Sequence, residues 1–224
     1  MESYLQQLLR IVVDAYITSG EPVGSQTLVE RYRLDMSPAT VRNWFAELEE
    51  LGYLERPHSS GGRLPTEKGF RAYIDWFVSA KPASKRERER IERTAGRHDE
   101  QGIKRIAKTL ADVTGLTVVV DLGEAGTFYT GLSQLFTQPE FHNWQRVVSL
   151  MEVLDRLDET FAALHAHAFD EPEIFIGRGC PFGSSCGSVL GSVGGSLIGI
   201  LGPIRMDYQH AFSLMGSVYD LYYE

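Results

Sequence analysis

Hydrophobic positions near the start of the chain recur at the spacing of amphipathic helices. In residues 3–18, apolar side chains return every three or four positions and make one continuous face. The same spacing predicts helices at about 25–32 and 38–51, with Ser25 and Ser37 as their N-caps. We therefore expect the chain to begin with a small bundle of three helices.

The segment after this bundle changes from helical to alternating and polar. Residues 53–56 are typical of a short strand, and Arg63-Leu64 is a candidate returning strand after a glycine-rich loop. Thr66 is expected to cap a fourth helix that runs to about residue 80. The hairpin is a candidate wing beside the bundle.

The rest of the chain mixes strand and helix patterns around one core. Gly194-Gly195 predicts the turn of a hairpin, and Asp207 is a candidate cap for the last helix. We expect helices at 84–113, 143–165 and after 207, and strands at 116–122, 174–176 and within 188–202. This mixture predicts an α+β domain.

Composition places the chain among ordinary globular proteins. It has 224 residues, 43% hydrophobic and 23% charged, enough apolar material for real cores. No apolar run approaches the ~20 residues of a membrane span, and the start does not resemble a secretory signal. Cys180 and Cys186 make no disulfide framework. We expect a cytoplasmic protein without membrane association, whose two thiols are inert rather than redox-active or metal-binding.

The net charge of −8 is distributed unevenly. Residues 1–80 hold 8 basic and 11 acidic side chains, residues 81–110 hold 10 and 5, and residues 111–224 hold 4 and 14. The acidity argues against a protein that coats nucleic acid, but it lies mainly after residue 110. The first segment must then bind any DNA through a few placed residues.

The helix at 38–51 has the chemistry of a helix that reads DNA bases. Its first turns expose Thr40, Arg42 and Asn43, and arginine and asparagine pair bidentately with guanine and adenine. Ser37 and the free backbone N–H groups around it suit a phosphate. Alternatively, Arg42 and Asn43 are ordinary solvated residues. The neighbouring short helix and the basic loop favour the interpretation that this helix binds DNA.

The loop of the candidate wing supplies a second set of contacts. Candidate phosphate ligands there are His58, Ser59, Ser60 and Arg63, with Lys68 just beyond the loop. Ser25 and Thr27 could meet phosphate at the start of the second helix. The alternative for the loop is a plain surface hairpin.

Five segments of the chain match one known family, namely GEPVGSQTL (20–28), SPATVRNWFAELEELGYLE (37–55), PHSSGGRLPTEKGFRAYID (57–75), FYTGLSQLFTQPEF (128–141) and IGILGPIRMDY (198–208). Through these segments the chain resembles the HrcA family of heat-inducible transcription repressors. Two features differ from the family. The stretch from Thr117 to Thr127 is short, so the early second domain and an inserted dimerisation segment are missing or reduced, and Gly62 replaces the usual alanine.

The resemblance implies an architecture of three parts. The expected protein is α+β, with an N-terminal winged helix-turn-helix domain at 1–80, a charged linker helix at 81–113, and a reduced GAF-like regulatory and dimerisation domain at 114–224. It places the groove-reading turn on Ser37, Thr40, Arg42 and Asn43 and the wing on 58–63.

The resemblance also implies a function. The expected protein is a homodimeric repressor of heat-shock and chaperone genes that binds an inverted-repeat operator in double-stranded DNA. A GroEL-type chaperonin is the implied regulatory partner. The alternative is a transcription regulator whose GAF-like domain senses a small molecule. We expect no enzymatic activity, no cofactor and no metal.

Overall fold

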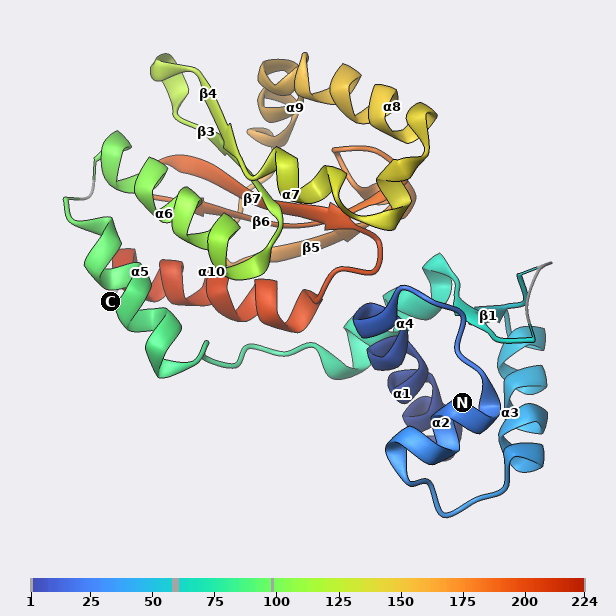
Figure 1. The fold of residues 1–224 in the computed structure, drawn as a ribbon. Helices are drawn as coiled ribbons and strands as arrows, with labels where there is room; N and C mark the ends of the chain where they lie inside the picture. Colours follow the sequence, from blue (N-terminus) through green and yellow to red (C-terminus); the bar gives the residue numbers. More distant parts are fainter. Residues whose placement is uncertain (1, 58–60, 98, 224) are drawn as a thin grey trace. The chain divides into compact units, whose positions relative to one another are not determined.

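The chain folds into two units, residues 1–78 and 79–224. The computed structural model describes residues 2–57, 61–97 and 99–223, and Figure 1 traces the chain through both units. Within the described residues, none of the helices has the length and apolar character that crossing a bilayer requires.

In its described residues, the first unit contains four helices and a two-stranded antiparallel ladder. Its elements are α1 (Ser3–Ser19), α2 (Ser25–Tyr32), α3 (Pro38–Glu50), β1 (Leu54–Glu55), β2 (Leu64–Pro65) and α4 (Glu67–Phe77). The apolar stripes of the helices meet in one core that includes Leu8, Leu9, Val12, Val41, Phe45, Leu48 and Phe70. The predicted order of helices and hairpin is confirmed.

Two predicted helix starts in this unit are confirmed and one is wrong. Ser37 Oγ accepts a hydrogen bond from Thr40 N at 3.1 Å, and Thr66 Oγ1 accepts from Gly69 N at 3.1 Å. Ser25 does not cap α2, because extended Gly24 occupies the N-cap position and Ser25 is already the first helical residue. A glycine N-cap leaves no side chain to satisfy the first N–H groups.

The second unit is a five-stranded antiparallel sheet with helices on both faces (Figure 1). Its strands are β3 (Thr117–Asp121), β4 (Thr127–Thr130), β5 (Glu173–Ile176), β6 (Cys186–Val193) and β7 (Ser196–Pro203), in the order β4-β3-β7-β6-β5. Its helices are α5 (Lys85–Ala95), α6 (Glu100–Thr114), α7 (Leu132–Phe136), α8 (Trp144–Leu154), α9 (Leu157–Leu164) and α10 (Tyr208–Tyr223). Three short 3₁₀ turns lie at Gly123–Ala125, Pro139–His142 and Gly177–Gly179. The predicted mixture of helix and sheet is confirmed.

Burial on both faces explains the apolar central strands. Val119, Leu190, Leu197 and Leu201 belong to a core with α7, α8 and α9. Neighbouring positions such as Val118 and Ile200 are equally buried, although alternate side chains point to opposite faces of the sheet. In Figure 1, α6 and α10 lie across the other face. Strands buried on both sides read as continuous apolar runs rather than as alternating ones.

Local signals correctly predict two turns of this unit. Gly194 and Gly195 have φ of 57° and 82°, the left-handed pair that a two-residue hairpin turn requires. Asp207 Oδ1 accepts a hydrogen bond from His210 N at 2.9 Å at the start of α10.

Two long predicted helices are each divided into two. The segment 84–113 breaks after Ala95, where Gly96 adopts φ 62°, and restarts when the Asp99 side chain accepts from Gly102 N at 2.8 Å. The segment 143–165 breaks between Leu154 and Leu157. Both α5 and α6 belong to the second unit, so residues 81–113 are not one linker helix. Strand β4 was not predicted, since it is a partly exposed edge strand with a weak pattern.

Candidate nucleic-acid interface

Helix α3 is anchored by one face and presents its first turn to solvent. Val41, Phe45 and Leu48 are at most 1% exposed and fix the rotation of the helix about its axis. At its start, the Ser37 hydroxyl lies 3.0 Å from the Thr40 hydroxyl and also accepts from the Thr40 backbone. The capping contacts therefore engage both hydroxyls with each other and define where the helix begins.

Arg42 and Asn43, in the second turn of α3, have side chains available for contact. Both are exposed, since they lie between buried Val41 and buried Phe45, on the side of the helix away from the core. Within residues 2–57, 61–97 and 99–223, neither has a hydrogen-bond or ion-pair partner. A rigid helix with an unpaired guanidinium and amide in its first turns can offer both groups to base edges.

The start of α2 and the turn that ends it carry further polar and basic residues. Ser25 is half-buried and Thr27 is exposed. Arg33 ends α2 with φ 50°, the sole positive φ at a non-glycine residue in the described chain, and its side chain is exposed. Sequence reasoning missed Arg33, because arginine is not a residue that signals a left-handed turn.

The hairpin is joined to the segment before α2 by backbone pairing. Val23 N donates to Arg63 O at 2.9 Å, and Arg63 N donates to Val23 O at 3.0 Å. Beside this bridge, a Cβ placed on Gly62 would lie 2.8 Å from the Pro22 backbone carbon. Glycine at this position therefore permits an approach of the two segments that alanine does not. The predicted contacts His58, Ser59 and Ser60 lie outside the described residues.

The Arg63 side chain is buried between the hairpin and α3 rather than exposed at the surface. Its side chain is 6% exposed, and Nε donates to Glu49 Oε2 at 2.9 Å. Nη1 also donates to the carbonyls of Gly61 and Gly62, each at 3.3 Å. A guanidinium enclosed in this way is not presented to a phosphate. The prediction that Arg63 contacts a phosphate is at odds with this position. Its acidic partner, Glu49, belongs to α3, and the sequence of the loop alone does not show that partner.

Lys68 is exposed but also engaged. Its Nζ donates to the Leu51 carbonyl at 2.7 Å and lies 4.5 Å from the centre of the Tyr53 ring. A cation at the last carbonyls of α3 interacts favourably with the helix dipole. The structure thus brings Thr40, Arg42 and Asn43 together on one turn, whereas Arg63 and Lys68 secure the two ends of the hairpin. Arg56, exposed at the end of β1, is a further cation that we did not predict.

Within residues 79–97 and 99–223, the cysteines and histidines of the second unit form no cluster that could hold a metal ion. Both thiols are buried and free, and burial raises the pKa of Cys186 to about 12. No group of three or more His, Cys, Asp or Glu side chains in the described part of the chain could hold a metal ion. Arg205 pairs with Glu140 and Gln138.

Residues 78–212 match the family model described as the HrcA protein C-terminal domain. This chain belongs to the HrcA family. Among curated HrcA proteins, the heat-inducible transcription repressor of Pelotomaculum thermopropionicum is 42% identical over 118 residues, which are 51% of this chain and 34% of that protein. The repressor of Anaeromyxobacter sp. (strain K) is 51% identical over 90 residues, 40% of this chain and 26% of that protein. The matched segments thus span about a third or less of these relatives.

One solved structure shares the fold of this HrcA chain. It is a crystal structure of a hypothetical protein at 2.2 Å resolution, with a TM-score of 0.75 and 16% identity over 99% of this chain and 97% of that chain. At this identity the likeness concerns the fold alone.

Proposed function

We propose that this HrcA chain is a sequence-specific DNA-binding transcription repressor of heat-shock and chaperone genes. The observation that carries the proposal is the N-terminal part of α3, where Arg42 and Asn43 are exposed and have no hydrogen-bond or ion-pair partner within the described residues, on a helix whose other face is buried in the core. The names of the relatives, heat-inducible transcription repressors, support it.

In this proposal the first unit is a winged helix-turn-helix domain. Helix α3 enters the major groove, with Arg42 and Asn43 at base edges and Ser37 and Thr40 beside a phosphate. Ser25 and Thr27 at the start of α2, with Arg33 and Arg56, contact the backbone. Arg63 and Lys68 position the hairpin instead of touching DNA.

The second unit is proposed to be a GAF-like domain that supports a homodimer. Two α3 helices would then read half-sites of an inverted repeat, separated by about 34 Å, one helical turn, or a multiple of it. Regulation by a GroEL-type chaperonin, which would be occupied by unfolded proteins in heat, is part of the same proposal. The ligand-sensing alternative lacks comparable support, since neither relative's name mentions a ligand.

Competition binding tests the proposal directly. The full chain would be titrated into a duplex carrying an inverted repeat that the chain itself selects from a randomised pool, and into the same duplex with that repeat scrambled. We expect the selected duplex to bind at least ~10³-fold more tightly. Equal affinity for both duplexes would refute sequence-specific recognition.

A further inference from the structure

Helix α5 carries three arginines along one stripe of its surface. Arg86, Arg90 and Arg93 follow one another at spacings of four and three residues, which places them within one narrow sector of the helix. All three are exposed. The exposed acidic residues of this helix, Glu89 and Glu92, lie on an adjoining sector of its circumference.

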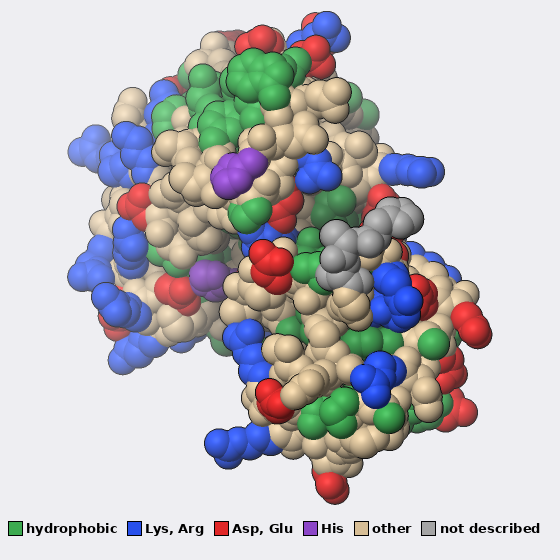
Figure 2. Space-filling view, turned by 45° about the vertical axis from the view of Figure 1, so that its right-hand side comes forward, with side chains coloured by type: hydrophobic (Ala, Val, Ile, Leu, Met, Phe, Trp, Pro, Cys, Tyr) green, Lys and Arg blue, Asp and Glu red, His purple; other side chains and the backbone are tan. Residues whose placement is uncertain are grey.

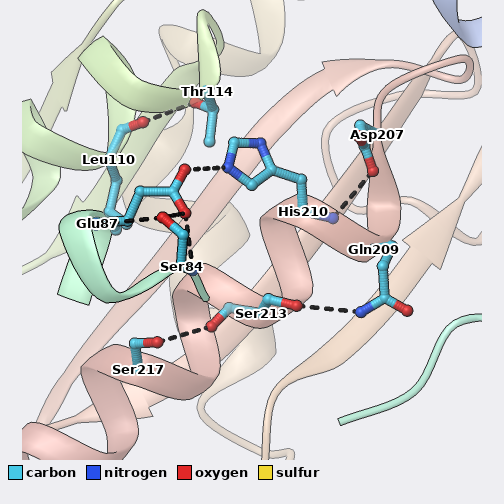
Figure 3. A network of polar contacts seen from close by, with 9 residues as sticks. All are labelled: Ser84, Glu87, Leu110, Thr114, Asp207, Gln209, His210, Ser213 and Ser217. Atoms are coloured by element: carbon cyan, nitrogen blue, oxygen red, sulfur yellow. Dashed lines mark hydrogen bonds and ion pairs between the residues drawn. The ribbon is translucent and has the colours of Figure 1, made fainter. Parts of the chain in front are cut away.

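The orientation of this stripe is determined by contacts on another side of α5. Glu87 Oε1 lies 2.8 Å from His210 Nε2, and the other carboxylate oxygen accepts from Ser84 N at 2.9 Å, as Figure 3 shows. Ile91, one turn further, is 1% exposed. With Glu87 and Ile91 directed inward, the arginine stripe is held outward.

The stripe borders an open groove of about 620 Å³ between α5 and α6. Arg90 Nη2 lies 2.9 Å from Asp112 Oδ2, so one acidic residue neutralises one arginine. Arg93 Nε donates to the Glu89 carbonyl at 3.0 Å. Arg86 has no hydrogen-bond or ion-pair partner within the described part of the chain. In Figure 2, Lys and Arg side chains gather along the left-hand edge, the side on which Figure 1 draws α5 and α6.

The first unit has few cations to offer to a phosphate backbone. Arg63 and Lys68 make internal contacts, and Arg71 Nη2 lies 2.9 Å from Glu67 Oε1. Residues 1–80 as a whole are net acidic, whereas residues 81–110 hold twice as many basic as acidic side chains. Because phosphate contacts supply most of the non-specific affinity for DNA, the proposed function needs further cations.

We propose that Arg86 and Arg93, supported by Arg90, form a second DNA contact of this chain, one that binds backbone phosphates. This inference rests on the proposed function. Arginine suits it, since its planar fork binds phosphate oxygens in pairs.

The test compares two double variants of the full chain on fluorescent duplexes of about 40 base pairs, roughly four helical turns. Arg86→Gln/Arg93→Gln removes the stripe and keeps the Arg90–Asp112 pair. Arg146→Gln/Arg156→Gln removes two exposed arginines from the α8–α9 region of the same unit as a matched control. Circular dichroism and thermal unfolding verify that both variants fold, and light scattering gives their oligomeric state.

The measured quantity is the slope of log affinity against log salt. The stripe variant should flatten this slope by about two units for each bound chain, or about four for the proposed dimer, since each lost phosphate contact accounts for about 0.9. Its affinity should fall by the same factor on the selected and the scrambled duplex, because phosphates carry no sequence information. The control variant should retain the wild-type slope.

The outcomes separate this inference from the proposed function. A wild-type chain that prefers the selected duplex, together with a stripe variant of unchanged slope, would overturn the second contact alone. A wild-type chain without preference would refute the proposed function, and the slope on the scrambled duplex would still decide the role of the stripe. A stripe variant that changes the oligomeric state of the free protein, with an unchanged slope, would assign the arginines to a contact between copies of the chain.

Discussion

Arg63 Nε lies 2.9 Å from Glu49 Oε2, and this ion pair ties the hairpin to the last turn of α3. The arginine side chain is 6% exposed and the glutamate side chain 33%. The pair therefore couples the position of the hairpin to the helix that is proposed to read bases, and removing either partner tests that coupling.

Arg63→Ala should destabilise the fold rather than weaken a phosphate contact. Loss of charged hydrogen bonds from a buried group should lower the free energy of unfolding by about 1.5–3 kcal/mol, measured by urea denaturation. Arg71→Ala, which breaks an exposed pair with Glu67, is the control and should cost no more than ~0.5 kcal/mol. An unchanged unfolding curve with a salt slope reduced by about one unit would instead make Arg63 a phosphate ligand.

Gly62→Ala should be destabilising although it adds only one methyl group. The new Cβ would lie 2.8 Å from the backbone carbon of Pro22, so the hairpin and the segment before α2 must separate. We expect a loss of about 1–3 kcal/mol in chemical unfolding. Gly61→Ala is the matched control, since a Cβ there meets nothing within 4 Å. Equal stability of the two variants would show that the hairpin adjusts without cost.

Arg42→Ala should alter which sequences are bound. If Arg42 reads a base, its loss should cost about 1–3 kcal/mol of binding free energy and relax discrimination at one operator position. Binding to single-base operator variants measures this, with Arg71→Ala as the control. A uniform loss of affinity across all sequences would identify Arg42 as a phosphate contact.

Glu87→Gln should have an effect that depends on pH. Burial acts to raise the pKa of Glu87, but hydrogen bonds from Ser84 and His210 outweigh it and hold the pKa below its usual value. A carboxylate with a lowered folded-state pKa stabilises the fold above its unfolded pKa and loses that contribution as the pH falls through the folded value. The variant should therefore be less stable than wild type near neutral pH, with a difference that shrinks below about pH 4.5.

Urea unfolding of this pair between about pH 3 and pH 7 measures the difference. Glu89→Gln on the same helix is the control, because Glu89 is exposed and lies 3.9 Å from its partner Lys85. A difference between wild type and Glu87→Gln that stays constant with pH would contradict the role assigned to the carboxylate.

Cys186 and Cys180 should resist alkylation in the folded protein. Burial raises the pKa of both thiols, that of Cys186 to about 12, so the reactive thiolate is scarce at pH 8. Iodoacetamide labelling followed by mass spectrometry should find neither thiol modified in the native chain and both modified in denaturant. Rapid labelling of the native chain would show that this region opens.

Much of the helical structure could be predicted from local signals. The caps Ser37, Thr66 and Asp207 act within three residues of themselves, and the Gly194-Gly195 turn needs only its own backbone freedom. Such features do not depend on distant parts of the chain, so their pattern is visible in the sequence. The two candidate base-contacting residues, Arg42 and Asn43, are also predicted from a local pattern, that of the helix at 38–51.

Features that depend on distant partners could not be predicted so well. Gly187 and Gly191 of β6 have no room for a Cβ because Tyr208 and Tyr219 of α10 pack against them. No local pattern records this approach. The break of 84–113 into two helices is different, because Gly96 and the Asp99 cap mark it locally, while the packing of α5 on α6 and α10 depends on distant partners.

The amino-acid sequence by itself determined the amphipathic helices, their caps and the turn residues, because these depend on neighbours within a few positions. Only the tertiary structure decided which of the arginines that the sequence predicts to be exposed are paired and which have no partner. Arg63 reads as a loop arginine, yet Glu49 lies fourteen positions away and draws it into the core. Arg42, by contrast, has no hydrogen-bond or ion-pair partner within the described residues. The physical reason is that the role of a charged side chain depends on the partner that folding places beside it, and that partner can lie far along the chain.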